Sequence, residues 1–179
     1  AGRLTDVVRT GTSAYTDAFT FDGAGNVIGA VRDGASETWT VDGDSQLTTR
    51  GGATYTYDAA GRTVARNDLV NATMTWEGPH LTAATESTTA ATYIYDADGL
   101  LVRRIEGGAE TRYLWDKSEG GVPRVLATYD ASGVLLESFV WDAHGLLQVR
   151  SGGATSTVIR DRLGSIRGLT DGTGAVTDT

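Results

Sequence analysis

A short motif recurs along this chain of 179 residues. Two aromatic or β-branched residues at alternate positions precede an acidic residue, a glycine follows three residues later, and aliphatic residues come next. The clearest copies run from Tyr55 to Val64 and from Tyr93 to Val102, and another runs from Phe139 to Leu147. The acidic residues of complete and degenerate copies, at positions 22, 42, 58, 77, 96, 116, 130, 142 and 161, are 20, 16, 19, 19, 20, 14, 12 and 19 residues apart. A period near twenty indicates an architecture of repeated supersecondary units.

Each copy predicts a β-hairpin. In Tyr55-Thr56-Tyr57 the alternation places both aromatic side chains on one face of a strand, and these residue types favour strands over helices. Asp followed by Gly at the fourth position is typical of a type I turn, in which the carboxylate accepts bonds from backbone N–H groups. Glycine pairs at 51–52, 107–108, 120–121 and 152–153 predict the turns between successive hairpins. We therefore predict an all-β chain of repeated antiparallel β-hairpins, since no window shows sustained helical periodicity.

The repeat motif is assigned to the aromatic, acidic and glycine positions of these copies. They are Phe21, Asp22, Gly25, Tyr55, Tyr57, Asp58, Gly61, Tyr93, Tyr95, Asp96, Gly99, Tyr129, Asp130, Gly133, Trp141, Asp142, Gly145, Asp161 and Gly164.

Composition disfavours several classes of protein. The net charge of −8 disfavours a phosphate-binding surface. The absence of cysteine excludes a disulfide framework and leaves the redox compartment open. The sequence has no stretch of eighteen apolar residues and no charged-then-apolar leader, so it predicts neither a transmembrane helix nor a signal peptide.

The number of repeats limits how the chain can close. Nine or ten hairpins laid side by side contain roughly twenty strands and span about 95 Å. Curled up, such a sheet would enclose a hollow roughly 30 Å across, too wide for its own side chains to fill. The sheet must fold onto itself, contribute to a larger shell, or end in exposed edges, and the shell requires the least strain.

We expect residues 1–179 to form a single repeat segment of about nine hairpin units, cut from a longer protein. Repeat-like sequence reaches both ends without a polar capping unit. Stacked repeats normally need caps, so the isolated piece is expected either to associate edge to edge or to curl into a closed form.

Paired carboxylates are candidates for acid–base chemistry or Ca²⁺ binding. Asp96 with Asp98 and Asp42 with Asp44 are such pairs, but the turn of the repeat already requires an Asp at its first position. Leu100 stands where a Ca²⁺ loop needs another oxygen ligand. The preferred interpretation is that these acids are turn residues.

The two histidines likewise give no evidence of a metal or catalytic site. His80 and His144 have no cysteine or second histidine nearby, as a zinc site would require. His144 lies in a predicted turn, where we expect it to be exposed. We therefore predict no catalytic, cofactor-binding or metal-binding residue, no cofactor and no enzyme activity.

The aromatic residues allow two interpretations. Trp39, Trp76, Trp115 and Trp141, with the tyrosines, could form a carbohydrate-binding platform. Repeats place like beside like, so equivalent aromatics in adjacent hairpins are instead expected to stack as cross-strand pairs, each contributing about 0.5 kcal/mol. Stacking is the preferred interpretation and ligand binding the alternative.

On these residues the chain resembles the Rhs/YD-repeat family. The Tyr-Asp-x-x-Gly core of that family is met from Tyr57 to Val64, from Tyr95 to Val102 and from Tyr129 to Leu136, with Trp replacing Tyr from Trp141 to Leu147. The stretch from Ile159 to Asp171 is similar to the segment near the end of Rhs shells. The resemblance covers nearly the whole chain.

The resemblance implies a curved spiral sheet that is part of a hollow YD-repeat shell. Such shells enclose toxins in bacterial polymorphic toxins and Tc toxins, and a related shell belongs to the teneurins. By this resemblance the chain is a non-enzymatic shell segment, secreted or at the cell surface, whose partners are a polypeptide cargo and the remaining repeats of the parent chain. Neither nucleic acid nor membrane insertion is implied. The family's self-cleaving terminal core is absent, so no autoproteolytic residue is expected. The alternative is a cell-surface adhesion or glycan-binding repeat module.

Overall fold

The computed structural model describes residues 2–10, 14–118 and 121–178. These residues form eighteen β-strands and, within the described ranges, no helix, so the predicted all-β fold of repeated antiparallel hairpins is confirmed. No described segment is a helix long and apolar enough to cross a membrane. The strands are β1 (Asp6–Arg9), β2 (Tyr15–Phe21), β3 (Val27–Arg32), β4 (Ala35–Val41), β5 (Leu47–Arg50), β6 (Ala53–Tyr57), β7 (Thr63–Asn67), β8 (Asn71–Glu77), β9 (His80–Glu86), β10 (Thr89–Tyr95), β11 (Leu101–Glu106), β12 (Ala109–Asp116), β13 (Arg124–Tyr129), β14 (Leu135–Asp142), β15 (Gly145–Ser151), β16 (Ala154–Arg160), β17 (Ile166–Thr170) and β18 (Val176–Asp178).

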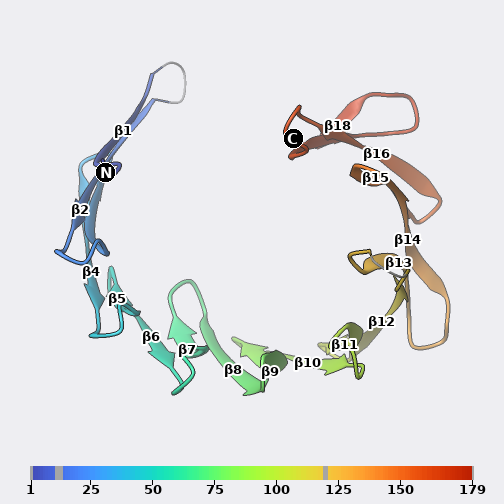
Figure 1. Ribbon diagram of the computed structural model, residues 1–179, viewed down its shortest axis with the longest axis horizontal. Coiled ribbons are helices and arrows are strands. Elements are labelled where there is room, and N and C mark those ends of the chain that lie inside the picture. Colours follow the sequence, from blue (N-terminus) through green and yellow to red (C-terminus); the bar gives the residue numbers. More distant parts are fainter. Residues whose placement is uncertain (1, 11–13, 119–120, 179) are drawn as a thin grey trace. The chain divides into compact units, whose positions relative to one another are not determined.

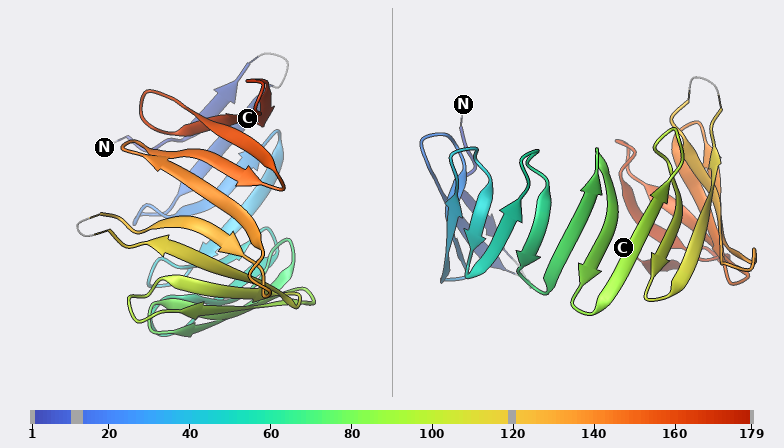
Figure 2. Two further views of the ribbon diagram at one scale, coloured as in Figure 1. Left: turned by 90° about the vertical axis from the view of Figure 1, so that its right-hand side faces the viewer. Right: turned by 90° about the horizontal axis from the view of Figure 1, so that it is seen from below.

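The chain divides into two compact units. The first comprises Ala1–Glu77 with Ala83–Thr89 and contains β1 to β8. The second comprises Gly78–Thr82 with Ala90–Thr179 and contains β11 to β18 and all of β10 but Thr89, while β9 contributes residues to both. Within each unit every strand lies beside the next strand of the sequence and runs antiparallel to it (Figures 1 and 2).

Two kinds of turn make most of the connections between strands. In the Asp turns, which span five residues, the N–H of the fourth residue donates to the C=O of the Asp, and the N–H of the Asp donates to the C=O of the fifth. In four two-residue turns both residues have positive φ, as a type I′ hairpin requires. The Asp turns are residues 22–26, 42–46, 58–62, 96–100, 130–134, 161–165 and 171–175. The type I′ turns are residues 33–34, 51–52, 107–108 and 152–153.

The position of a turn in the chain decides the edge on which it lies. Strands alternate in direction, so turns after even-numbered and odd-numbered strands lie at opposite edges of a unit. In the first unit all three Asp turns follow even strands and share one edge. In the second unit the turns at Asp96 and Asp161 follow even strands, but those at Asp130 and Asp171 follow odd strands. The sequence spacings of 14 and 12 around Asp130 therefore mark steps of one strand, where spacings near 20 mark steps of two.

A β-bulge accompanies every Asp turn. In the turn at Asp58 the ladder pairs Tyr57 with Thr63 and Thr56 with Ala65, so Val64 is the extra residue. A bulge bends its strand and increases the local twist. It also accounts for aliphatic runs, such as Leu101-Val102, that break the alternation expected of a strand. The extra residues are Ile28, Thr48, Val64, Val102, Leu136, Arg167 and Thr177.

The described chain lacks a conventional hydrophobic core. Its buried residues are all small (Ala30, Ala72, Ala91, Ala127 and Thr128), and no large side chain is less than 2% exposed. The accessible surface is 11827 Å², whereas a globular protein of this length exposes about 8,300 Å². Both faces of the hairpins therefore remain largely accessible, and the ladder bonds carry much of the cohesion.

Candidate functional site: the aspartate turns and the aromatic face

The Asp carboxylate organises each Asp turn from within. In the turn at Asp58, one carboxylate oxygen accepts from the backbone N–H groups of Ala60 (2.9 Å) and Arg62 (3.0 Å). The other oxygen accepts from Nε of Arg62 at 2.7 Å. Gly61 has a φ of 77°, a conformation that costs a side-chain-bearing residue about 1–2 kcal/mol. The Asp and Gly of the motif are therefore the two residues that this turn needs.

These hydrogen bonds favour the ionised carboxylate. The Arg62 side chain is the main cause that lowers the pKa of Asp58. The side chain of Asn26 has the same effect on the pKa of Asp22, Lys117 on that of Asp96, and Thr173 on that of Asp171. These four turns are therefore occupied by charged carboxylates at neutral pH.

Two copies of the motif depart from this geometry. The turn at Asp142 is one residue shorter, because Asp142 pairs directly with Gly145 across Ala143 and His144. Its carboxylate accepts from the N–H of His144 at 2.7 Å, and Gly145 already belongs to β15. At Asp42 the fourth position holds Ser45, which adopts a φ of 62° without being glycine.

The aromatic residue before the Asp closes the gap between hairpins. The ladder between β5 and β6 stops at the pair Thr49–Thr54, short of the Asp-turn edge. Beyond it, the phenol of Tyr57 donates to the carbonyl oxygen of Leu47 at 2.8 Å. Such hydrogen bonds satisfy backbone carbonyls that the ladder leaves unpaired.

The same aromatic-to-carbonyl hydrogen bond recurs in both units. In each case the acceptor is the backbone of the preceding strand. The pairs are Trp76 Nε1 to Thr63 O (2.8 Å), Tyr95 Oη to Leu81 O (3.0 Å), Trp115 Nε1 to Leu101 O (2.8 Å) and Trp141 Nε1 to Val125 O (2.7 Å). Before Asp161 the residue is Arg160, whose guanidinium donates to Leu146 O instead.

The rings contact arginine more than one another. Four guanidinium groups lie over aromatic rings, at 4.8–5.8 Å from the ring centroid, the range of cation–π contacts. The pairs are Arg3 over Phe21, Arg50 over Trp39, Arg62 over Trp76 and Arg124 over Trp141. In the described part of the chain the one ring-to-ring contact is His80 with Tyr95, at 4.5 Å. The expected stacking of equivalent aromatics is therefore replaced by arginine contacts and hydrogen bonds.

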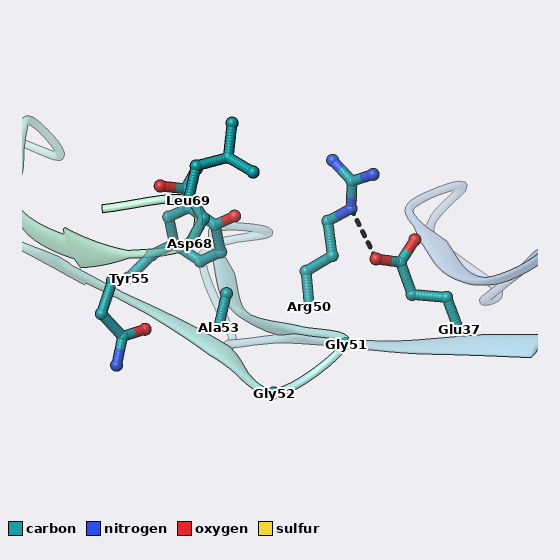
Figure 3. Close-up of a pocket in the computed structure, with 9 residues that line it drawn as sticks. Glu37, Arg50, Gly51, Gly52, Ala53, Tyr55, Asp68 and Leu69 are labelled. Atoms are coloured by element: carbon teal, nitrogen blue, oxygen red, sulfur yellow. Dashed lines mark hydrogen bonds and ion pairs between the residues drawn. The ribbon is translucent and has the colours of Figure 1, made fainter. Parts of the chain in front are cut away.

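Ladder register places most aromatics of each unit on one face, which we call the aromatic face; Tyr129, which pairs with Arg112 while Tyr113 pairs with Thr128, lies on the other face. In the first unit Trp39 pairs with Arg50, Arg50 with Ala53, and Tyr55 follows two residues later in β6. This part of the face borders a hollow of about 560 Å³ at the Gly51–Gly52 turn (Figure 3). In the second unit a larger open hollow of about 850 Å³ is lined by Tyr113, Phe139 and Trp141, with Arg104 and Glu137 among the polar residues.

The paired carboxylates of Asp96 and Asp98 already have a partner. Nζ of Lys117 lies 2.6 Å from carboxylate oxygens of both Asp96 and Asp98, so an ammonium group occupies the place between them. Among the residues with a described position, no three His, Cys, Asp or Glu side chains converge as a metal site would need. His144 is exposed in the short turn.

The structure places the predicted motif residues in repeated positions. Phe21, Tyr57, Tyr95 and Tyr129 end their strands, Trp141 is the penultimate residue of β14, and Tyr55 and Tyr93 lie two residues before Tyr57 and Tyr95. The acids Asp22, Asp58, Asp96, Asp130 and Asp161 begin Asp turns in which Gly25, Gly61, Gly99, Gly133 and Gly164 are the fourth residues. Of the predicted paired-glycine turns, three are type I′ turns, and Gly120 of the fourth lies outside the described residues.

Some residues with a structural role were not predicted from the sequence. Asp171 and Gly174 form a further Asp turn that obeys the same Asp-x-x-Gly spacing and could have been counted. The roles of Arg160 and Arg50 depend on where neighbouring ladders end, which residue types do not reveal.

The chain matches the family model described as the teneurin YD-shell over residues 1–178. No curated protein sequence matches it. Among solved structures it is similar to a chain of the Tc holotoxin pore of Photorhabdus luminescens, with 16% identity and a TM-score of 0.49 over 94% of this chain and 10% of that one. It is also similar to a chain of the TcdB2–TccC3 structure, with 11% identity and a TM-score of 0.29 over 89% of this chain and 11% of that one. The chain thus spans about a tenth of the length of these structures.

Proposed function

Because this chain belongs to the teneurin YD-shell family, and so is a shell segment, we propose that it helps to enclose a polypeptide cargo such as a toxin. Its role is to form wall and not to catalyse a reaction. Its partners are the cargo and the remaining repeats of the parent protein, and the protein acts after secretion or at the cell surface.

The observation that carries this proposal is the lack of a core. The buried residues of the described chain are small, and large apolar side chains such as Leu135 (53% exposed) and Leu114 (47% exposed) remain accessible. Apolar surface on this scale gains free energy when another surface covers it. Neighbouring repeats and an enclosed polypeptide are the covers that a shell supplies.

The side-chain hydrogen bonds between hairpins support the proposal, because they connect neighbouring strands into a continuous wall. A phenol or indole N–H bonds the preceding strand where the ladder stops, as Tyr57 and Trp115 do. The carbonyl oxygens of Leu47 and Leu101 are therefore satisfied without a second layer of structure. An enclosing surface needs this property, because it must be continuous and thin.

Limited proteolysis of the intact parent protein tests encapsulation. We expect the cargo region enclosed by the shell to resist a broad-specificity protease, and to be digested only after the shell is unfolded by denaturant, as followed by mass spectrometry. A matched digestion of the cargo region expressed alone sets the rate for an unprotected chain. Digestion of that region at the same rate in the intact protein would refute enclosure.

The alternative, a glycan-binding module, is favoured by one observation, the aromatic lining of the hollow in the second unit. However, the indole N–H of Trp141 is already bonded to Val125, and Arg124 lies over its ring at 5.5 Å. Sugar binding needs a free ring face. Isothermal titration with a panel of oligosaccharides separates the two functions, since binding that is lost in Phe139→Ala and Tyr113→Ala would establish the alternative.

A further inference from the structure

Arg50 is held in place at one side of its guanidinium group only. Its Nε donates to Oε1 of Glu37 at 3.0 Å, and its Cζ lies 4.8 Å from the ring centroid of Trp39. The indole N–H of Trp39 donates to the other oxygen of Glu37 at 2.9 Å. The three side chains therefore brace one another, and this leaves the two terminal amino groups of Arg50 free to bond elsewhere.

The other arginines that cover aromatic rings use their terminal groups within the Asp turns. Nη1 of Arg3 donates to Asp22 O, Nη2 of Arg62 lies 2.6 Å from the Asp58 carboxylate, and Nη1 of Arg124 donates to Asp142 O. Arg50 lies at the opposite end of its strand, beside the Gly51–Gly52 turn. Within the described part of the chain its terminal amino groups have no hydrogen-bond partner.

These amino groups border the hollow of the first unit. Figure 3 shows Arg50 rising beside Glu37 on one side of the hollow, with Asp68 and Leu69 on the other and the glycine turn between them. Both oxygens of Asp68 already accept from Nη1 of Arg66 at 2.9 Å. The phenol of Tyr55, which also lines the hollow, has no hydrogen-bond partner among the described residues.

The unused groups define the chemistry of a ligand. Both are donors, so the ligand must accept hydrogen bonds. The planar fork of a guanidinium matches a carboxylate, with which it forms paired charge-assisted bonds. Asp68 and Glu37 nearby disfavour the second charge of a phosphate. Leu69, which is 94% exposed, offers an apolar contact beside the fork.

We propose that this hollow is a binding site for a carboxylate side chain, Asp or Glu, carried by a polypeptide next to an apolar residue. Arg50 binds the carboxylate, Tyr55 donates the third hydrogen bond, and Leu69 covers the apolar neighbour. Glu37 and Trp39 are positioning residues, because they act through Arg50. The site does not depend on cargo enclosure, since any extended acidic segment offers this chemistry.

An NMR titration tests the site on the chain itself. The probe is N-acetyl-Leu-Glu-amide, and the signal followed is the indole N–H of Trp39, assigned with Trp39→Phe. We expect a saturable shift with this peptide and none with N-acetyl-Leu-Gln-amide, which lacks the charge. Arg50→Lys keeps the charge but loses the fork and should weaken binding about tenfold, and Tyr55→Phe about threefold.

The control is Arg124→Lys, which alters a ring-covering arginine far along the sequence and should leave binding unchanged. N-acetyl-leucine, a terminal carboxylate, and inorganic phosphate are separate arms, and both are expected to bind more weakly. Equal binding of the Glu and Gln peptides, tighter binding of phosphate, or unchanged binding in both Arg50→Lys and Tyr55→Phe would overturn the proposal. If Arg50→Lys does not fold, the binding measured for Tyr55→Phe alone tests the proposal.

Discussion

The two ends of a hairpin in this chain are built on different principles. At the type I′ ends, such as Gly152–Gly153, the ladder runs to the turn and the backbone alone completes the connection. At the Asp-turn ends the ladder between hairpins stops early, and side chains take over. A carboxylate fills the turn and a bulge bends the strand, and at Tyr57 and Tyr95 the phenol O–H bonds the backbone of the preceding strand. The Asp-turn end of the hairpin therefore requires particular residue types, whereas the type I′ end accepts more of them.

The recurring residues of the motif are needed at only one of these two ends. The Asp, the Gly and the aromatic residue all belong to the Asp-turn end, where each has a distinct partner. The type I′ end asks only for residues that tolerate positive φ, and Asp33 fulfils this with a φ of 47°. The four predictions that follow compare the two ends, beginning with the largest expected effect.

Substitution of the fourth residue of an Asp turn should be the most damaging. In Gly61→Val a β-branched residue must adopt a φ of 77°, and its Cβ would lie 3.0 Å from Nε2 of Gln46. We expect a loss of about 2 kcal/mol or more in the free energy of unfolding, measured by urea titration. Gly152→Asn at a type I′ end, with open space around its Cβ position and a φ of 57°, should be nearly neutral. Equal losses at both ends would remove the distinction.

The hydrogen bond between hairpins can be isolated within a single strand. Tyr57→Phe leaves Leu47 O without its donor and should cost about 1 kcal/mol. Tyr55→Phe, two residues earlier, removes a hydroxyl that has no partner among the described residues and should leave the unfolding midpoint unchanged. The comparison fails if both variants melt alike.

Acid should weaken the Asp-turn ends selectively. The folded-state pKa of Asp58 lies below its ordinary value of 3.8, chiefly because Arg62 bonds the carboxylate. The stabilisation is therefore complete above the unfolded-state pKa and is lost as the pH falls through the folded-state value. Asp58→Asn should lower the urea midpoint at pH 7 and flatten its decline below about pH 5. Asp44→Asn, whose carboxylate has no hydrogen-bond or ion-pair partner among the described residues, is the control and should behave as the unaltered chain does.

The smallest effect is expected at the only lysine of the chain. Lys117 pairs with Asp96 and Asp98, which links two neighbouring hairpins at the same edge, but its side chain is 45% exposed. Lys117→Met should lower the melting temperature slightly at low salt and not at about 1 M salt, where exposed pairs are screened. Lys117→Arg should retain the wild-type value. A loss that persists at high salt would show that packing, and not charge, joins these hairpins.

Much of this could be predicted from the sequence because turns are local. Asp-x-x-Gly and Gly-Gly have their own backbone requirements, so the hairpins at Asp58 and Gly107–Gly108 follow from short-range rules. The change of edge at Asp130 could not be predicted, because the sequence does not show that single strands, and not pairs of strands, separate Asp130 from the acids on either side. The bulge was hidden in aliphatic runs such as Leu100-Leu101-Val102, where two residues share one ladder position.

The candidate site was less predictable than the fold. The motif named the aromatic residues, but their partners are backbone carbonyls, and every residue has one. Only the early end of the ladder beside Leu47 makes that carbonyl available to Tyr57. Arg50 belongs to no motif at all, and its exposed fork results from Glu37 and Trp39 holding the opposite side of the group.

The alternation of strand direction turns the spacing of the acids into a rule for insertions. Adding a whole hairpin of about twenty residues returns the next Asp turn to the edge it would have had, whereas adding a single strand transfers every later turn to the opposite edge. The interval of 14 and then 12 around Asp130 is one such transfer followed by its reversal. Chains of this construction can therefore lengthen in steps of two strands without disturbing the loops already in use, and the distances between acids in a related sequence would show where a step of one strand has been made.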